Sequence, residues 1–118
     1  ERQQPDHVFN QVIAILLLLA DAQQQGKIIT IRSIRQQLAI DRGQIETLLL
    51  RLAEMQYVAE SKRGWLLETS PEQILLSDLF HHFVYRRNAL PQNPLLNERM
   101  TECCQPLHIN IAQLYRQQ

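Results

Sequence analysis

The side chains best suited to metal binding or covalent catalysis are few and poorly spaced. The chain has four histidines and two cysteines, and the only neighbouring pairs are His81-His82 and Cys103-Cys104. Adjacent residues on a helix point about 100° apart, so His81 and His82 would not bind the same ion. The spacings of zinc sites, phosphate-binding loops and nucleophile elbows are absent. The sequence therefore predicts no catalytic residue, no metal site and no cofactor, and we expect Cys103 to be a small core residue.

Recognition of a partner is the chemistry that the middle of the chain favours. A helix expected over 42–56 occupies the position of the second helix of a helix-turn-helix, which in many proteins reads DNA. The formal charges on its outer face cancel, and Leu50 would be desolvated against phosphates without gain. This pattern indicates a protein-contact face rather than a DNA-reading one. The residues predicted to form it, together with the tip of the following hairpin, are Gln44, Thr47, Leu50, Arg51, Lys62 and Arg63.

Basic residues near this helix keep DNA binding open as the alternative function. Arg32 and Arg35 on the preceding helix could touch a phosphate backbone, as could Lys62 and Arg63. They are few, and four acidic residues lie nearby in the sequence. The whole chain has 12 basic and 12 acidic residues, whereas a dedicated nucleic-acid binder usually has a basic excess. A winged-helix transcriptional regulator is therefore the second hypothesis.

Helix-capping signals define the elements that would hold this face in place. Thr30 and Asp41 are good N-cap residues, and each follows an isoleucine that can form a hydrophobic staple with the first turn of its helix. Asn110 repeats the signal near the C-terminus. The expected helices cover residues 6–25, 31–39, 42–56, a stripe from 76 to 84, 95–105 and 111–115.

Strand signals surround the two central helices. A short strand is expected over 27–29, and a hairpin over 57–61 and 65–68, with Lys62-Arg63-Gly64 at its tip. The order predicts a mainly α fold: a winged helix-turn-helix with a small two- to three-stranded wing sheet, flanked by N-terminal and C-terminal helices. A chain of 118 residues fits one domain. Its expected parts are 1–26, 27–68 and 69–118.

Both flanking regions carry expectations of their own. The helix over 6–25 is apolar on nearly every side from Val12 to Leu19, so we expect it to be buried, in the core or in a dimer interface. A membrane span needs about 20 apolar residues, and this helix has too short a run. The helix over 95–105 should bury Leu96, Met100 and Cys103. Arg86-Arg87 would complement a helix dipole or face anionic headgroups. The start at Glu1, without methionine or signal peptide, suggests an excised domain.

The stretch RLAEMQYVAESKRGWLLETSPEQILLSDLF, residues 51–80, resembles the C-terminal cytoplasmic tail of the YihY/BrkB family of polytopic inner-membrane proteins. In that family a helix and a winged helix follow the last span, and a "pe.itlaDL" segment, here Pro71 to Leu79, begins the next helix. Leu75 departs from the pattern, which tends to have a Thr or Ser cap. The resemblance implies a regulatory or interaction domain on the cytoplasmic face of the bacterial inner membrane. No catalytic residue transfers for the ribonuclease label that some members carry.

The same resemblance implies the partners of the domain. They are the membrane-spanning portion of the same polypeptide or another protein. The residues themselves also leave self-association open, with nucleic acid as the less favoured option. A rival resemblance is to small winged-helix repressors that bind an iron–sulfur cluster and share the "PEQI…SDL" segment. Those proteins have a glycine-rich wing, reduced here to Gly64, and three spaced cysteines that this chain lacks. The membrane-protein tail is therefore the favoured interpretation.

Overall fold

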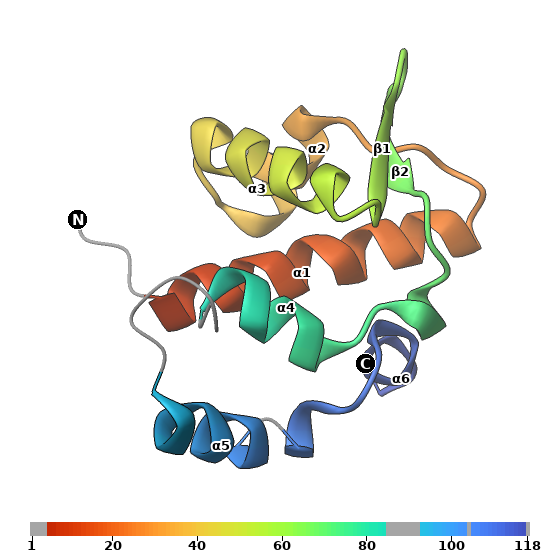
Figure 1. The fold of residues 1–118 in the computed structure, drawn as a ribbon. Helices are drawn as coiled ribbons and strands as arrows, with labels where there is room; N and C mark the ends of the chain where they lie inside the picture. Colours follow the sequence, from red (N-terminus) through yellow and green to blue (C-terminus); the bar gives the residue numbers. More distant parts are fainter. Residues whose placement is uncertain (1–4, 85–92, 104, 118) are drawn as a thin grey trace.

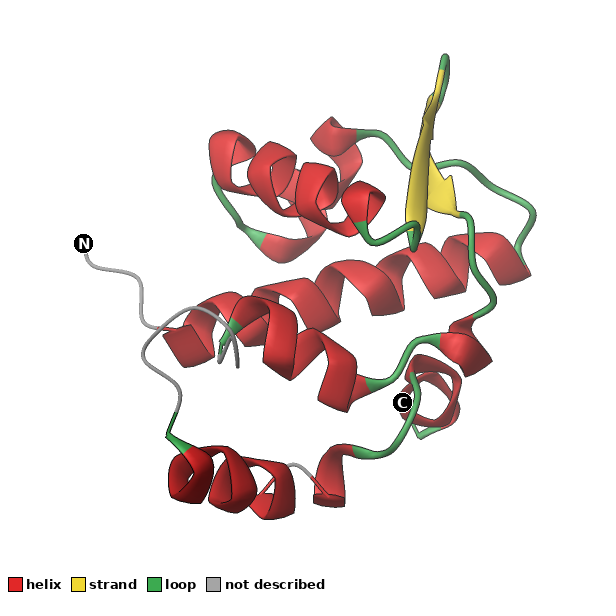
Figure 2. Ribbon diagram, viewed as in Figure 1, coloured by secondary structure: helices red, strands yellow, loops and turns green. Residues whose placement is uncertain are grey.

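The computed structural model describes residues 5–84, 93–103 and 105–117 of the chain, and these are mainly helical. Figure 1 shows α1 crossing the middle of the molecule, with α2, α3 and a hairpin on one side and α4, α5 and α6 on the other. The elements are α1 (Pro5–Gln24), α2 (Ile31–Leu38), α3 (Arg42–Glu54), β1 (Val58–Ser61), β2 (Gly64–Leu67), α4 (Leu76–Phe83), α5 (Pro94–Cys103) and α6 (Ile111–Arg116), with short 3-10 turns at Pro71–Gln73 and Gln105–Leu107. The predicted winged helix-turn-helix is confirmed (Figure 2).

Helix α1 forms the centre of the hydrophobic core. It packs against α2, α4, α6 and strand β2. Val12, Ile15, Leu16 and Leu19 are fully buried, with exposed fractions of 0 or 1%. Residues on its other faces are partly buried against the same core. The expectation that this all-apolar helix is buried is confirmed, because neighbours within the chain cover it.

The three predicted N-caps are present. The Thr30 hydroxyl oxygen accepts a hydrogen bond from the Ser33 amide at 3.1 Å and starts α2. Asp41 starts α3 in the same way, and Asn110 forms a reciprocal capping box with Gln113 at the start of α6. Each cap satisfies backbone donors that would otherwise lack a partner in the first helical turn. Local capping chemistry therefore defines where these helices begin.

The wing is a hairpin with a two-residue tip. β1 and β2 pair antiparallel, with Val58 opposite Leu67 and Ser61 opposite Gly64. The strand predicted over 27–29 is reduced to one bridging residue, Ile29, which exchanges two backbone hydrogen bonds with Trp65 at 3.1 and 2.7 Å. Because Thr30 already caps α2, the chain leaves the sheet after this single residue.

Backbone hydrogen bonds between two loops join the starts of α4 and α6. Ser70 caps a single 3-10 turn. Helix α4 starts at Leu76, and Leu75 at its N-cap position makes no side-chain cap bond. The Leu76 amide donates to the Ile109 carbonyl at 2.9 Å, and the Ile111 amide donates to the Ile74 carbonyl at 3.0 Å. These two bonds hold the start of α6 beside the start of α4.

The expectation that α5 buries Leu96, Met100 and Cys103 is wrong. Leu96 is 49% exposed, Cys103 is exposed and Met100 is only partly buried. Helix α5 has its main contact with the short turn that follows it, and Figure 1 shows it at the end of the molecule furthest from the wing. Its apolar spacing therefore has no core to face. Arg86-Arg87 lie outside the described residues.

Within residues 5–84, 93–103 and 105–117, no helix combines the length and the apolar character needed to cross a membrane. Helix α1 is 20 residues long. Its apolar middle instead supplies the core of the fold.

Candidate functional site

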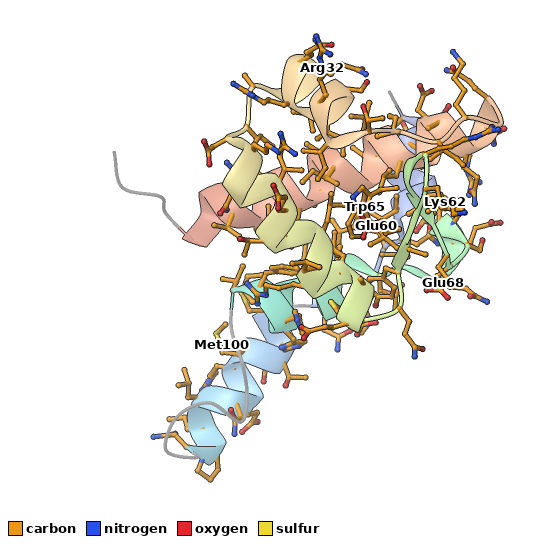
Figure 3. The ribbon with its side chains drawn as sticks, turned by 90° about the horizontal axis from the view of Figure 1, so that it is seen from above. Arg32, Glu60, Lys62, Trp65, Glu68 and Met100 are labelled. Atoms are coloured by element: carbon orange, nitrogen blue, oxygen red, sulfur yellow. The ribbon has the colours of Figure 1, made fainter. Side chains whose placement is uncertain are left out.

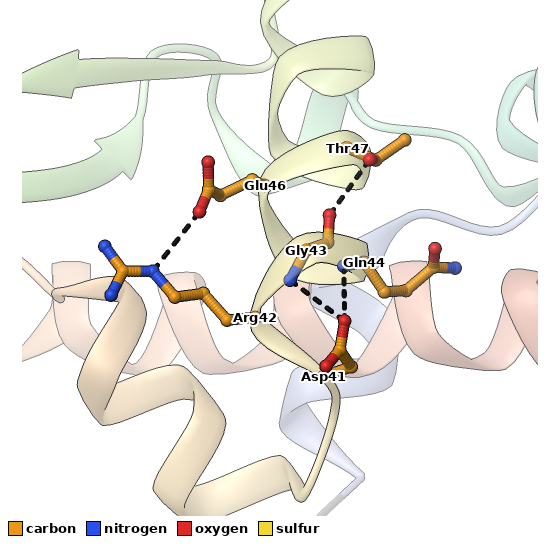
Figure 4. A network of polar contacts seen from close by, with 6 residues as sticks. All are labelled: Asp41, Arg42, Gly43, Gln44, Glu46 and Thr47. Carbon is orange, nitrogen blue, oxygen red and sulfur yellow. Dashed lines mark hydrogen bonds and ion pairs between the residues drawn. The ribbon is translucent and has the colours of Figure 1, made fainter.

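The first turn of α3 uses most of its polar groups to build the helix itself. The Asp41 carboxylate accepts from the amides of Gly43 at 3.0 Å and Gln44 at 3.4 Å, as Figure 4 shows. Arg42 Nε and Glu46 Oε1 form an ion pair at 3.2 Å. The Thr47 hydroxyl donates back to the Gly43 carbonyl at 2.9 Å. These bonds order the start of α3 and leave fewer polar groups to form hydrogen bonds with the edge of a DNA base.

Two of the predicted contact residues point back into the molecule. Gln44 Nε2 donates to the side-chain oxygen of buried Gln11 on α1 at 3.0 Å. Arg51 Nη2 donates to the His82 carbonyl at 2.9 Å, and its guanidinium carbon lies 4.2 Å from the centre of the Phe83 ring. Gln44 and Arg51 therefore connect α3 to α1 and α4.

Leu50 is the apolar group on the outer side of α3. It is 58% exposed, although its neighbours Leu48, Leu49 and Leu52 are buried. Large apolar side chains exposed singly are ordinary on protein surfaces, but Leu50 lies on the helix that winged-helix proteins usually present to a partner. With Thr47 exposed one turn earlier, it forms what we call the α3 outer face, defined by Thr47 and Leu50.

A second feature lies where α2, the start of α3 and the wing meet. An open hollow of about 520 Å³ has Trp65 and Gly64 among its lining residues. Five basic side chains and one acidic side chain, Glu60, also line it. The five are Arg32, Arg35, Arg42, Lys62 and Arg63, and we call this feature the basic hollow.

The wing tip has a defined geometry. The Ser61 hydroxyl oxygen accepts from the Arg63 amide at 3.2 Å, and the hydroxyl donates to the Gly64 carbonyl at 3.3 Å. These bonds close the two-residue turn that carries Lys62 and Arg63. In Figure 3 the Lys62 side chain lies on the wing and Arg32 on α2, with Trp65 and Glu60 labelled on the hairpin beside Lys62.

The predicted contact face therefore divides into three parts. Gln44 and Arg51 bind within the chain, Thr47 and Leu50 form the α3 outer face, and Lys62 and Arg63 belong to the basic hollow. Sequence reasoning noted Arg32 and Arg35 as phosphate-contact candidates but missed that they meet the wing tip and Arg42 around one hollow. The strand expected over 27–29 was the available signal, because a third strand in the wing sheet would bring the start of α2 beside the hairpin.

Two tyrosines outside the hollow have raised pKa values. Burial, and to a lesser degree the charge of Asp78, raises the pKa of Tyr57. The pKa of Tyr115 is raised mainly by the hydrogen bond that its hydroxyl donates to Asp21 at 2.8 Å. Both phenols are therefore neutral at physiological pH, and the Tyr115 bond joins α6 to α1. No three histidine, cysteine or acidic side chains within the described part of the chain are placed to hold a metal ion.

Comparison with known proteins relates the chain to part of a membrane protein. No family model matches it. It is 33% identical over 108 residues to a UPF0761 membrane protein of Neisseria meningitidis serogroup B, an alignment that covers 89% of this chain and 27% of that protein. It is 38% identical over 89 residues to a UPF0761 membrane protein of Chromobacterium violaceum, covering 75% and 21% respectively. The chain thus spans about a quarter of the length of the curated relatives it matches.

Solved structures with the same arrangement include CymR and IscR proteins. Staphylococcus aureus CymR superposes with a TM-score of 0.72 at 17% identity, covering 92% of this chain and 94% of that one. CymR of B. subtilis, described as a global cysteine regulator, gives 0.73 at 15% identity and 98% coverage of both chains. T. potens IscR gives 0.71 at 15% identity, covering 99% and 87%. At these identities the likeness establishes the winged-helix fold alone, and the sequence similarity relates this fold to a part of membrane proteins.

Proposed function

We propose that the chain is a regulatory or protein-interaction winged-helix domain of a polytopic inner-membrane protein of the YihY/BrkB type. It lies on the cytoplasmic face and is non-catalytic by itself. Its α3 outer face docks onto the membrane-spanning portion of the same polypeptide. The proposal unites two facts, the similarity to a quarter of a membrane protein and a winged-helix fold.

One observation carries this proposal. The helix that would read DNA has Gln44 and Arg51 bound to other helices and an apolar Leu50 facing outward. Reading a base edge requires directed hydrogen-bonding groups in the groove. An exposed leucine beside a threonine hydroxyl suits a protein surface better, because burying the 58% of Leu50 that is exposed stabilises a complex by about 1 to 2 kcal/mol.

The alternative is a DNA-binding transcriptional regulator, and the basic hollow is the observation that favours it. Its basic side chains could contact phosphates beside a groove. Phosphate contacts alone bind DNA without regard to sequence. A regulator must also discriminate its site, typically by a factor of about a thousand or more over mixed-sequence DNA.

Docking through Leu50 predicts that Leu50→Asp weakens retention of the domain on the membrane portion by about tenfold, since burial of the exposed part of Leu50 is worth about 1 to 2 kcal/mol. The full-length protein is reconstituted in nanodiscs with a protease site between this chain and the rest. After cleavage in high salt, the fraction of the chain that stays with the nanodisc is measured. High salt screens charge attraction to lipid, so what remains reports protein docking.

Leu95→Asp is the matched control, because Leu95 on α5 is 59% exposed, almost the same as Leu50. It should leave retention unchanged. Release of the unmodified domain, or equal release by both variants, would contradict docking through the α3 outer face. A duplex sequence bound about a thousandfold more tightly than mixed-sequence DNA would instead establish the regulator.

A further inference from the structure

Charge is strongly segregated in a chain that is neutral overall. The chain has 12 basic and 12 acidic residues, so its formal net charge is zero. The basic hollow takes five of the basic residues and one acidic residue, Glu60, which leaves it at +4. Outside the hollow, residues 5–84, 93–103 and 105–117 include four basic and ten acidic residues, which sum to −6. The described part of the chain is therefore polarised, with its positive pole between α2 and the wing.

This positive pole is held by well-defined backbone. Thr30 caps α2 at one edge of the hollow, and the Ile29–Trp65 bridge fixes α2 against the hairpin. Ser61 closes the turn that presents Lys62 and Arg63. Glu46 pairs with Arg42, but both side chains are at least half exposed, and such surface pairs contribute little. The basic groups thus surround an open hollow, and the acidic side chains that line it are too few to neutralise them.

We propose that the basic hollow binds the phosphate groups of anionic phospholipid headgroups on the bilayer that carries the rest of the protein. This inference rests on the proposed function, because only a domain tethered to a membrane meets that surface permanently. The hollow is open, and basic groups from α2, α3 and the wing surround it. Several of these groups can therefore contact different phosphates of a lipid surface at the same time. The acidic remainder of the molecule is repelled by the same plane. The domain is thereby oriented with α2 and the wing toward the bilayer.

The same charge pattern fits duplex DNA less well. On a duplex, the basic groups would hold the backbone while α3 enters the major groove. That placement would put Leu50 against a polar surface and would require Gln44 and Arg51 to release their bonds to Gln11 and His82. A lipid surface requires neither change. The lipid headgroup is therefore the phosphate source to which the observations point.

The test uses this chain, which carries its own core, with large vesicles at low salt. The expected result is binding to phosphatidylcholine vesicles that contain phosphatidylglycerol, and none to phosphatidylcholine alone. Each basic residue near an anionic surface strengthens binding about fivefold, equivalent to about 1 kcal/mol. Arg32→Glu combined with Lys62→Glu should therefore weaken the vesicle partition coefficient by at least about 25-fold, the product of two such losses.

Arg99→Glu combined with Arg116→Glu is the matched control. It makes the same change in net charge on α5 and α6, away from the hollow. Binding should fall by less than about fivefold, because the net charge acts only at longer range and is screened. Thermal melts check that both double variants fold, and the milder pair Arg35→Gln and Arg63→Gln gives a second reading if the first unfolds.

Three results would overturn the inference. The first is no binding to anionic vesicles, and the second is an equal loss in the hollow and control variants. The third is displacement of the protein from the vesicles by a competitor, either inorganic phosphate or mixed-sequence duplex DNA. The ionic strength is kept the same, and the competitor supplies a lower concentration of phosphate groups than the lipid does. None of these outcomes affects the high-salt nanodisc measurement, so the lipid site and protein docking can fail separately.

Discussion

Leu16→Ala is expected to lower the free energy of unfolding by about 3 to 4 kcal/mol, the cost of removing a fully buried leucine and leaving a cavity. Leu16 has an exposed fraction of 0% on α1, which packs against four other elements. Urea denaturation followed by circular dichroism measures the change. The urea midpoint should fall while the slope of the free energy with urea stays the same. Such a loss is a large part of the stability of a typical domain, about 5 to 15 kcal/mol.

Leu50→Ala makes the same chemical change at a position that is 58% exposed, and it should alter stability by less than about 0.5 kcal/mol. The measurement is repeated at several protein concentrations. A core helix gives a midpoint that does not depend on concentration, whereas a helix buried mainly in a dimer interface gives one that rises with it. A cost below about 1 kcal/mol for Leu16→Ala would show that α1 is not the centre of the core.

Capping residues made the helix starts predictable because their effect is local. Thr30, Asp41 and Asn110 each accept from amides within three residues along the chain, so the sequence contains both donor and acceptor. Helix α5 shows the limit of this reasoning. Its apolar spacing resembles a buried stripe, but burial depends on where the chain places a neighbouring surface. Leu96 remains 49% exposed, so the spacing alone did not predict its surroundings.

The candidate site was less predictable than the fold for the same reason. Lys62 and Arg63 were foreseen at the wing tip, but their meeting with Arg42 depends on how the hairpin packs beside α2 and α3. For a long polar side chain at the edge of a helix face, the spacing also does not tell whether it turns inward or toward solvent. Arg51 precedes buried Leu52 and reaches inward to the His82 carbonyl. Charge balance counted along the sequence hid the segregation that the fold produces.

Docking and lipid binding, as proposed, would act on neighbouring elements of one module. The α3 outer face offers an apolar group, and the basic hollow offers charge at the start of the same helix and on the wing. An apolar contact resists salt, whereas attraction to anionic lipid falls as ionic strength rises. The lipid surface would orient the domain, and docking through Leu50 would give it a specific partner. The position of the wing relative to α2 is therefore critical to the lipid part of the proposal.

Gly64→Ala is expected to cost about 3 kcal/mol or more, because it combines backbone strain with a steric clash. Gly64 has a φ of +146°, a conformation that L-residues rarely adopt. A Cβ there would collide with the Ile29 carbonyl oxygen and lie 2.8 Å from its carbon, so the Ile29–Trp65 bridge must shift. Urea denaturation measures the stability. The fluorescence of Trp65, the single tryptophan and 5% exposed, should move to longer wavelength as the wing separates from α2.

Gly26→Ala separates the clash from the strain. Gly26 also has a positive φ, +68°, but a Cβ there would meet no atom within 4 Å. Its cost should be about 1 to 2 kcal/mol, the penalty of a left-handed conformation for an L-residue, with no change in Trp65 fluorescence. If the two variants lose equal stability, the close approach of the wing to Ile29 contributes nothing. In that case contact between Ile29 and the wing would not hold Lys62 and Arg63 beside α2. Gly64→Ala would then leave the basic hollow as it is, and its vesicle binding should equal that of the unmodified chain.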